Sequence, residues 1–411
     1  MSNNHTTHTS FLNLYKGWAI TFFAFAMLLI SNGMTLSGLS VFDQTIIQAL
    51  SCTRDQLKLG ELIQLITAGL FAPFIGTLAD RYDIKKLVTF GLIILGMGLF
   101  AYGEIQSLTQ LYLLRAVFGL ALACAGLIMA VLMVSQWFQG DKASARGLAV
   151  GFALVGSSLG NTFFAILNSR FIEMFGWREV FPLIAGAPLV LACVAWFAIQ
   201  SPPIEIEERV TDHTHDTSYY QAVTSLQFWI IAFSAMLTFY TILGVSSHLP
   251  LYLQGTGQFT LAQAGQKVGF VFLMSLFGKL IWGWLADRFS PRRLFTLTLA
   301  FMGIGAFLLT SMEMSYLMLA LSLFGFGWGG LYTMIQLLVV GSFDLSLVGR
   351  LLGSITLLDA LGGGLGPWVT AKLYQVHGSY QLPFTVITSM IVIVMIASLL
   401  LKPLNAETVS S

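Results

Sequence analysis

Residues 277–294 read FGKLIWGWLADRFSPRRL, an apolar stretch that contains one lysine, Lys279, and ends in a dense charged turn. A similar turn, GTLADRYDIKKL, occupies residues 76–87. Gly, Leu, Ala, Asp, Arg, two cations and a Leu therefore recur in the same order in both halves of the chain. Such an internal repeat indicates that the chain is built from two related halves.

The composition indicates a membrane protein rather than a soluble one. Of the 411 residues, 56% are hydrophobic and only 9% are charged, and 33 are Phe. A soluble domain of this length could not bury that much apolar surface. The net charge of +1 and the absence of a basic stripe argue against a nucleic-acid partner. The 3 cysteines do not form a disulfide framework.

The apolar residues fall into runs of about 20 residues, the length that crosses a bilayer as a helix. Helices are expected because a backbone inside hydrocarbon must satisfy its own hydrogen bonds. The sequence thus predicts an all-α membrane protein with twelve transmembrane helices in two six-helix bundles, with the runs at 17–41, 58–78, 87–103, 110–137, 146–171, 180–199, 228–253, 264–286, 294–310, 316–343, 351–373 and 382–401.

The cations predict the orientation of these helices. If both termini are cytoplasmic, most of the loop cations lie on the cytoplasmic side, as the positive-inside rule requires. We therefore expect a multi-pass protein of the plasma (inner) membrane. The cations left on the outer side are Arg54, Lys58, Arg170, Arg178, Lys267 and Lys372.

Two bundles and one connection are expected along the chain. Residues 1–200 form the N-terminal six-helix bundle, 201–223 a polar, acidic cytoplasmic linker, and 224–411 the C-terminal six-helix bundle. Residues 146–161 and 350–366 repeat an Arg followed by small residues one turn apart, which let helices approach closely. Two facing bundles predict alternating access, with the substrate near the midplane between them.

The two charged turns resemble the signature of the major facilitator superfamily, which occurs at the cytoplasmic junction of helices 2 and 3 and again of helices 8 and 9. The resemblance covers nearly the whole chain and implies a carrier that rocks about a central cavity. Further fragments are similar to the monocarboxylate porter and oxalate/formate antiporter branches. They are Trp137-Phe138, 145–151, Gly176-Trp177-Arg178, His248-Leu249-Pro250, Gly366-Pro367 and Gly378-Ser379-Tyr380.

The charged turns are expected to act as gates. An Asp at a helix end can pair with an Arg of a neighbouring helix and accept hydrogen bonds from a helix N-terminus. We expect two such latches, which hold the outward-facing state and break on inward opening. The alternative is a solvated loop kept inside by its positive charge. The residues concerned are Asp80, Arg81, Arg146, Asp287, Arg288 and Arg350.

Lys279 is the predicted anion-binding residue. It precedes the charged turn by eight residues, so it lies about 12 Å inside the membrane from that turn. A charge at that depth costs at least ~2.5 kcal/mol unless it is paired or faces water. Carboxylate-transporting relatives place an arginine at this position of helix 8. The lysine departs from that pattern, since it cannot form a bidentate fork with a carboxylate.

Asp359 is expected at the same depth as Lys279, in the eleventh span. A second cation is expected there in the oxalate/formate branch, so an aspartate argues against a dianion site. The two residues suggest competition, in which the substrate carboxylate binds Lys279 while Asp359 takes up a proton. The alternative is a static buried ion pair that locks two helices together.

Other polar groups are candidates for completing the site, each with helix packing as an equal alternative. Arg115 is expected near the outer end of its span, for outward gating or for pairing with Glu104 or Glu61. His248 resembles the histidine of the family's helix 7 and could titrate or be a satisfied structural residue. The remaining hydrogen-bonding candidates are Tyr332, Asn32, Ser275 and Gln336.

The sequence contains no phosphate-binding loop, metal-spaced His/Cys set or nucleophile elbow, so we expect neither an enzyme nor a cofactor. The prediction is a secondary transporter, functional as a monomer, that moves a small organic anion, a monocarboxylate, with protons. One alternative is an exporter of uncharged or amphiphilic compounds, given the 33 Phe and 16 Met. Another is a transporter-like sensor without flux.

Overall fold

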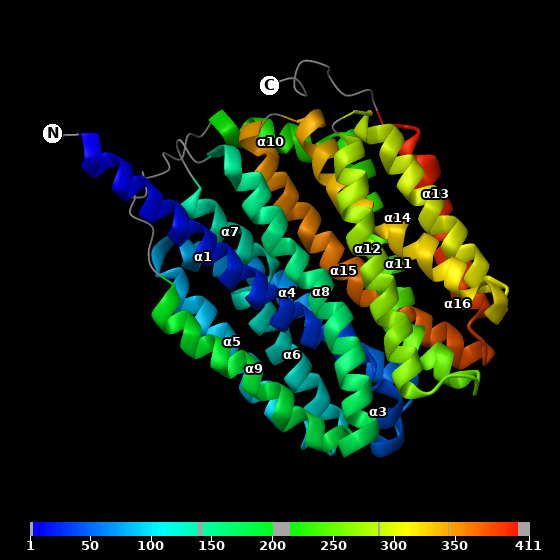
Figure 1. The fold of residues 1–411 in the computed structure, drawn as a ribbon. Coiled ribbons are helices and arrows are strands. Elements are labelled where there is room, and N and C mark those ends of the chain that lie inside the picture. Colours follow the sequence, from blue (N-terminus) through cyan, green and yellow to red (C-terminus); the bar gives the residue numbers. More distant parts are fainter. Residues whose placement is uncertain (1–2, 139–142, 200–213, 287, 344, 402–411) are drawn as a thin grey trace.

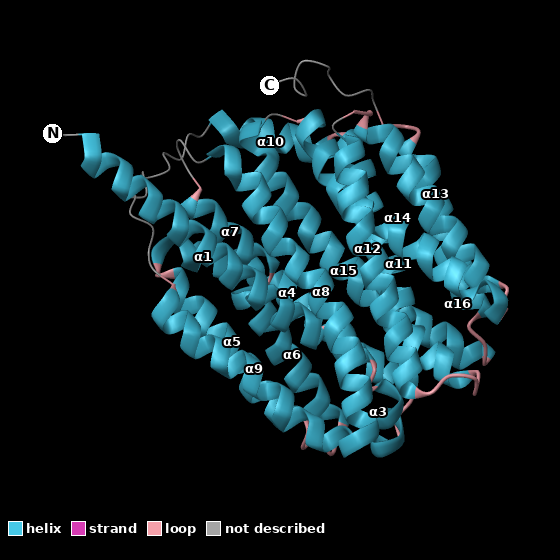
Figure 2. Cartoon of the chain, in the orientation of Figure 1, coloured by secondary structure: helices cyan, strands magenta, loops and turns pink. Residues whose placement is uncertain are grey.

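The protein is described by a computed structural model that covers residues 3–138, 143–199, 214–286, 288–343 and 345–401. The described residues are mostly helical and contain no strand (Figure 2). The N-terminal half consists of α1 (Asn3–Thr35), α2 (Ser37–Ser40), α3 (Asp43–Leu50), α4 (Arg54–Arg81), α5 (Ile84–Tyr102), α6 (Leu108–Ala125), α7 (Leu127–Trp137), α8 (Ala143–Phe175) and α9 (Trp177–Ala198).

A short helix, α10 (Thr214–Thr224), leads into the second half. Most of the predicted linker lies outside the described residues, and α10 begins within its last part. The C-terminal half consists of α11 (Leu226–Gly255), α12 (Leu261–Ala286), α13 (Pro291–Thr310), the 3-10 turn η2 (Met314–Tyr316), α14 (Leu317–Ser342), α15 (Leu345–His377) and α16 (Gln381–Ser398).

The predicted fold class is confirmed. Within the described part of the chain, 11 helical spans are long and apolar enough to cross a bilayer. The twelfth long helix, α15, has 33 residues, which at 1.5 Å each is ample length, although its charged and glycine residues lower its hydropathy. Helix starts carry their expected caps: Ser107 and Ser225 accept hydrogen bonds from Gln110 N and Phe228 N.

Two of the predicted spans are interrupted in the structure. The first span breaks at Leu36, between α1 and α2, and the fourth breaks at Gly126, between α6 and α7. A Cβ at Gly126 would lie 2.2 Å from the carbonyl oxygen of Leu122, so only glycine fits there. The spans predicted over 17–41 and 110–137 are therefore present, as Lys16–Ser40 and Leu108–Trp137, but each contains a local break that periodicity does not reveal.

Each half packs through its small residues as predicted. In α8, Cβ atoms at Gly156 and Gly160 would meet the α1 backbone at Phe25 and Leu29, 2.2 and 2.1 Å from their carbonyl oxygens. The equivalent pair in α15 packs in the same way against α11: Gly362 lies against Met236 and Gly366 against Tyr240. The repeated sequences thus form the same helix contact twice.

The two halves meet through two reciprocal helix pairs, α4 with α15 and α8 with α12. In Figure 1, α10 and the start of α1 lie at one end of the bundle and α3 at the other. We call these ends the α10 face and the α3 face. On the α3 face the Glu173 side chain of α8 accepts a hydrogen bond from Ala262 N in α12 (2.8 Å), which joins the halves at the rim.

Candidate functional site

The halves are closed toward the α3 face and separate toward the α10 face. Near the α3 face, Cβ atoms at Gly269 and Gly364 would lie within 3.0 Å of side chains or backbone from the opposite half, Ile166 and Leu62. On the same four helices, nearer the α10 face, a Cβ would meet no described atom within 4 Å at Gly76, Gly147, Gly151, Gly283 and Gly353. Gly76 lies seven residues from Gly69 and Gly283 fourteen from Gly269, which places each on the helix face that meets the opposite half, so we infer that this open space lies between the halves and call it the central opening.

Lys279 lies where the halves begin to separate. Its Nζ crosses from α12 to donate to Ser158 Oγ in α8 (2.6 Å). One turn further along α12 is Gly283, beside which there is open space. The Lys279 side chain is only partly buried. The predicted anion-binding cation therefore lies at the closed end of the central opening.

Asp359 lies at the corresponding point of the other helix pair. Its neighbour Ala360 packs against Gly69 of α4, and Gly353, six residues before Asp359, borders open space. Asp359 is 4% exposed, and its Oδ1 has no hydrogen-bond partner. Tyr332 of α14 is close enough to interact with both Asp359 and Gln336. These residues bring three predicted site residues together in one polar group.

The structure has no ion pair between Lys279 and Asp359. Among the described residues, ion pairs within 4.0 Å involve only Lys58, with Asp43 and Glu61. The alternative of a static pair that locks α12 to α15 does not apply to this conformation. The two groups are separately available.

Asn32 and Ser275 occupy different surroundings. Asn32 Nδ2 donates to Ser157 Oγ (2.9 Å), next to the Ser158 that receives Lys279. Ser275 is fully buried, its Oγ has no partner, and its backbone oxygen lies against Gly329 of α14. Asn32 thus extends the polar floor of the central opening, whereas Ser275 lies in the α12–α14 contact.

His248 is fully buried and both of its ring nitrogens have partners. Nδ1 lies 3.0 Å from the Tyr380 hydroxyl and Nε2 lies 2.8 Å from the Pro367 carbonyl oxygen. In this conformation the ring belongs to the closed α3 end and does not line the central opening.

Arg115 has neither of its two expected carboxylate partners in direct contact. Its Nε donates to the Tyr102 hydroxyl (3.1 Å) and its Nη1 to Gln64 Oε1 (3.0 Å). The residue is 1% exposed, and Nη2 has no partner. Two of its five N–H groups therefore donate to neutral oxygens of α4 and α5, and the pairing with Glu104 or Glu61, one of the two roles expected for Arg115, is not formed in this conformation.

Most of the predicted gating turn cannot be compared with the structure. Asp287 and the side chains of Asp80 and Arg81 lie outside the described residues. Of the other gating residues, Arg146 is exposed. Arg288 lies over the Trp284 ring (4.0 Å) and Arg350 over the Tyr219 ring of α10 (4.2 Å). The latches remain a prediction.

A buried ionic cluster at the α3 end was not predicted. Lys58 Nζ donates to Asp43 Oδ2 and to Glu61 Oε1, both at 2.5 Å. It also donates across the interface to Ser247, at the carbonyl oxygen (3.2 Å) and at Oγ (2.5 Å). Ser247 Oγ in turn donates to Glu61 Oε2 (2.6 Å).

Sequence reasoning placed Lys58 among the outer loop cations, but it is fully buried. The signal that could have revealed the cluster was Glu61, a carboxylate inside an apolar run. Ionisable residues within membrane spans are usually functional.

A second contact closes the same end. Arg54 of α4 lies over the Tyr374 ring (3.9 Å) and donates from Nη1 to the Tyr380 hydroxyl (2.7 Å). The same hydroxyl contacts His248. We call the two contacts together the α3 gate: Asp43, Lys58, Glu61, Ser247, Arg54, Tyr374, Tyr380 and His248.

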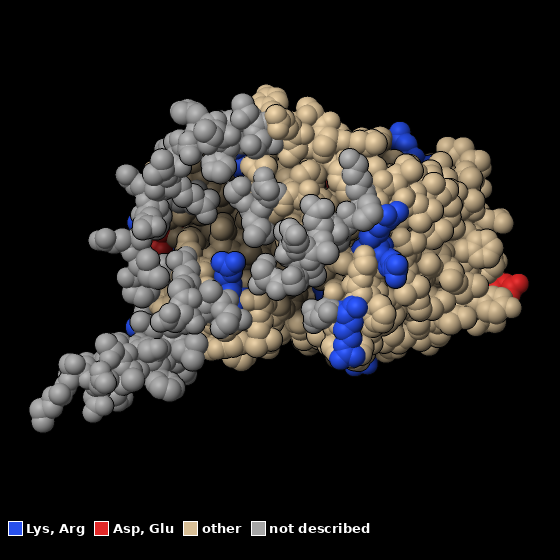
Figure 3. Space-filling model, turned by 90° about the horizontal axis from the view of Figure 1, so that it is seen from above, with Lys and Arg blue, Asp and Glu red and all other residues tan. Residues whose placement is uncertain are grey.

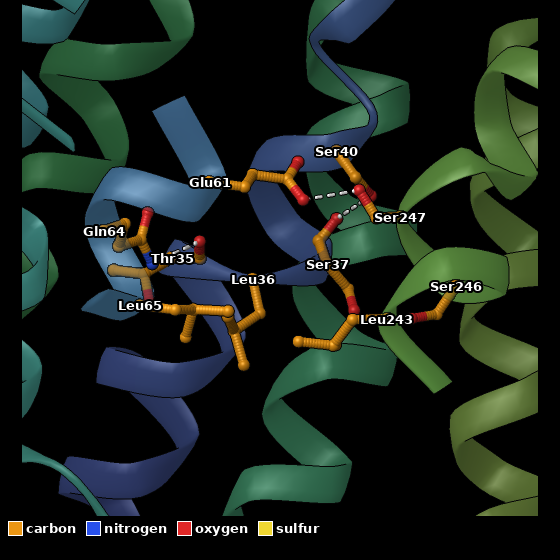
Figure 4. Close-up of a pocket in the computed structure, with 10 residues that line it drawn as sticks. All are labelled: Thr35, Leu36, Ser37, Ser40, Glu61, Gln64, Leu65, Leu243, Ser246 and Ser247. Carbon is orange, nitrogen blue, oxygen red and sulfur yellow. Dashed lines mark hydrogen bonds between the residues drawn. The ribbon is translucent and has the colours of Figure 1, made fainter. Parts of the chain in front are cut away.

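A small cavity of about 20 Å³ lies next to the α3 gate, which is room for about one water molecule. Figure 4 shows Glu61, Ser247 and Ser40 together on one side and the leucines on the other. The leucines, Leu36, Leu65 and Leu243, come from both halves. A water here can reach the Glu61 carboxylate.

Comparison with known proteins gives the family. A profile of the Major Facilitator Superfamily matches residues 21–367 and 257–410, which is most of the chain. The chain belongs to the Major Facilitator Superfamily. The predicted family is thereby confirmed, and with it membership of a family of membrane transporters.

Known members of the superfamily resemble the chain over different lengths. The sialic acid transporter NanX of Escherichia coli is 26% identical over 337 residues, 80% of each chain. Mouse monocarboxylate transporter 1 is 30% identical over 179 residues, 44% of this chain and 35% of the relative. A bacterial homologue of the human lysosomal transporter Spinster, solved in an inward-facing and occupied conformation, has a TM-score of 0.74 at 16% identity, covering 96% of both chains.

Proposed function

We propose that this superfamily member is a secondary active transporter that carries a small monocarboxylate together with protons. The observation that carries the proposal is the position of Lys279, which joins the halves through Ser158 at the closed end of the central opening. A substrate carboxylate that reaches Lys279 replaces a neutral hydroxyl with a charge-assisted hydrogen bond. The names of two relatives, a sialic acid transporter and a monocarboxylate transporter, refer to carboxylates as well.

Asp359 is proposed as the residue that carries the coupling proton. It is buried without an ion-pair partner, so a charge on it is costly and protonation removes that cost. A proton on Asp359 and an anion on Lys279 give a loaded site with no excess charge. That balance favours crossing of the loaded carrier over crossing of a half-loaded one.

The α10 face is proposed to be cytoplasmic, which makes this conformation inward-open. Lys and Arg side chains are spread over the described part of that face, and Asp and Glu are sparse there (Figure 3). Positive charge of this kind is typical of cytoplasmic loops. With this orientation both termini are cytoplasmic, the protein resides in the plasma (inner) membrane, and the α3 gate is the outer gate.

Uptake into proteoliposomes tests the proposal. The purified protein, reconstituted as it is, should accumulate radiolabelled lactate or pyruvate when the vesicle interior is alkaline. Lys279→Ala should raise the KM at least about tenfold, because a hydrogen bond to a charged group contributes about 1.5–3 kcal/mol. Lys267→Ala is the matched control, since Lys267 is a half-buried lysine of the same helix that contacts Met318 and does not bind Ser158.

Two results would contradict the proposal. One is the absence of gradient-driven accumulation together with undiminished transport of a neutral or amphiphilic compound by Lys279→Ala. That result would favour the exporter alternative. The other is the absence of counterflow of any solute, which would favour a sensor.

A further inference from the structure

The α3 gate contains an aspartate, Asp43, that transport at Lys279 and Asp359 does not use. Asp43 begins α3, just outside the first membrane span, and its side chain is completely buried. One carboxylate oxygen accepts from Lys58 (2.5 Å), and the other, Oδ1, has no hydrogen-bond donor. A fully buried carboxylate with an uncompensated oxygen is an expensive place for a charge.

The neighbours of Asp43 leave it short of positive charge. Among the residues that the structure describes, Lys58 is its only direct cationic contact, and Lys58 is shared with Glu61. Arg115 is near, but its hydrogen bonds go to the neutral oxygens of Tyr102 and Gln64. The titratable and charged groups that face Asp43 from the surrounding elements are Lys58, Glu61, Arg115, Tyr102, Cys52 and Tyr380.

Of the two carboxylates that share Lys58, Asp43 is the better proton acceptor. Glu61 also accepts from the Ser247 hydroxyl and keeps 15% side-chain exposure, beside a cavity with room for about one water. Asp43 accepts no hydrogen bond from a hydroxyl, and its side chain is completely buried. Burial raises the pKa of the Asp43 carboxyl to about 6, Glu61 adds to that rise, and Lys58 opposes it.

The cluster is also a contact between the halves. Lys58 and Glu61 both bind Ser247 of α11, so closure of the α3 gate seals the cluster and opening exposes it. We propose that Asp43 is a proton-binding residue of the α3 gate, and that a proton taken up there stabilises the closed gate. With that proton, the three groups in direct contact, Asp43, Lys58 and Glu61, have no net charge when closure buries them. Without it, the same three groups have a net negative charge.

The direction of the pH effect follows from linkage. The closed gate has an Asp43 pKa of about 6, and a hydrated Asp43 in the open gate has the ordinary value of 3.8. The closed state therefore binds the proton more tightly. The stabilisation of the closed gate by the proton is complete below pH 3.8 and is lost as the pH rises through about 6. Between pH 5 and pH 8 the closed-to-open ratio should fall about tenfold.

The experiment measures the gate directly in the full-length protein without substrate. The native cysteines are replaced by alanine, spin labels are attached at Gln106→Cys and Gln258→Cys, and distances are measured in nanodiscs between pH 5 and pH 8. Both positions are exposed on the α3 face, one in each half. The short distance should dominate at pH 5, and a longer one should grow toward pH 8.

Asp43→Asn, which resembles the protonated residue, should stay closed at every pH. Asp43→Glu keeps a titratable group and should keep the transition, and Glu104→Gln, an exposed carboxylate on the same face, should behave as the parent. A parent protein without any transition, or an unchanged transition in Asp43→Asn, would overturn the proposal. If Asp43→Asn does not fold, the presence or absence of the pH-dependent transition in the parent protein still tests the proposal. Because no substrate is used, this result is independent of whether the cargo is a monocarboxylate.

Discussion

At the scale of single residues, substitutions of Asp359 and of Lys279 are expected to cause different transport defects. Asp359→Asn removes the proton acceptor but leaves Lys279 and Ser158 in place. We predict that this variant loses accumulation driven by a pH gradient and keeps substrate counterflow between equal pH values. Both quantities can be measured in one set of proteoliposomes.

The control for that variant is Asp55→Asn, at the start of α4 and away from the central opening. It should retain both accumulation and counterflow. Full gradient-driven accumulation by Asp359→Asn would show that the proton is carried elsewhere, with the Asp43 and Glu61 pair as the next place to look.

Residues that stand out against an apolar background could be predicted from the sequence, but residues at span ends could not. Lys279 and Asp359 stand out because a charged side chain deep within a membrane span costs free energy unless it is paired, hydrated or used in function. Asp43 and Lys58 flank spans, where a charge usually meets water. Lys58 is buried in a tertiary contact with Ser247 of α11 and Asp43 in one with Lys58, and local sequence carries no information about such contacts.

At the scale of helices, α8 offers a matched pair of glycines. A Cβ at Gly160 would lie 2.1 Å from the Leu29 carbonyl oxygen, whereas a Cβ at Gly151 would meet open space. Gly160→Ala should therefore destabilise the protein by about 1–3 kcal/mol through forced separation of α1 and α8. Gly151→Ala should be neutral or stabilise by up to about 1 kcal/mol, because alanine is the better helix former.

The measurement is thermal unfolding of the two variants in detergent, followed by intrinsic fluorescence. Equal melting temperatures for Gly160→Ala and Gly151→Ala would contradict the close α1–α8 contact.

Helix positions followed from the sequence because hydrophobic length is a strong constraint in a bilayer. The interruptions at Leu36 and Gly126 did not, since a broken helix and a continuous one have the same composition. The repeat of small residues in α8 and α15 did predict which faces pack closely.

At the scale of the whole molecule, the conformation can be tested by chemical labelling. In a background without native cysteines, Gly353→Cys should react rapidly with a membrane-impermeant maleimide applied from the α10 side, because it borders the central opening. Gly363→Cys should react slowly, since it packs against Leu243 and Leu65. Right-side-out and inverted vesicles compare the two sides.

Rapid labelling of Gly353→Cys only from the extracellular side would reverse the proposed orientation. Equal labelling of both positions would show that the halves do not close toward the α3 face as described.

The rim contact between Glu173 and Ala262 N has a kinetic consequence. It joins α8 to the first turn of α12 and holds no substrate, so it must break once in every turnover, whether the carrier is loaded or empty. Its strength therefore contributes to the stability of this conformation and to the barrier for leaving it, without a direct contact to cargo. A carrier with a weaker rim would cycle faster at unchanged selectivity.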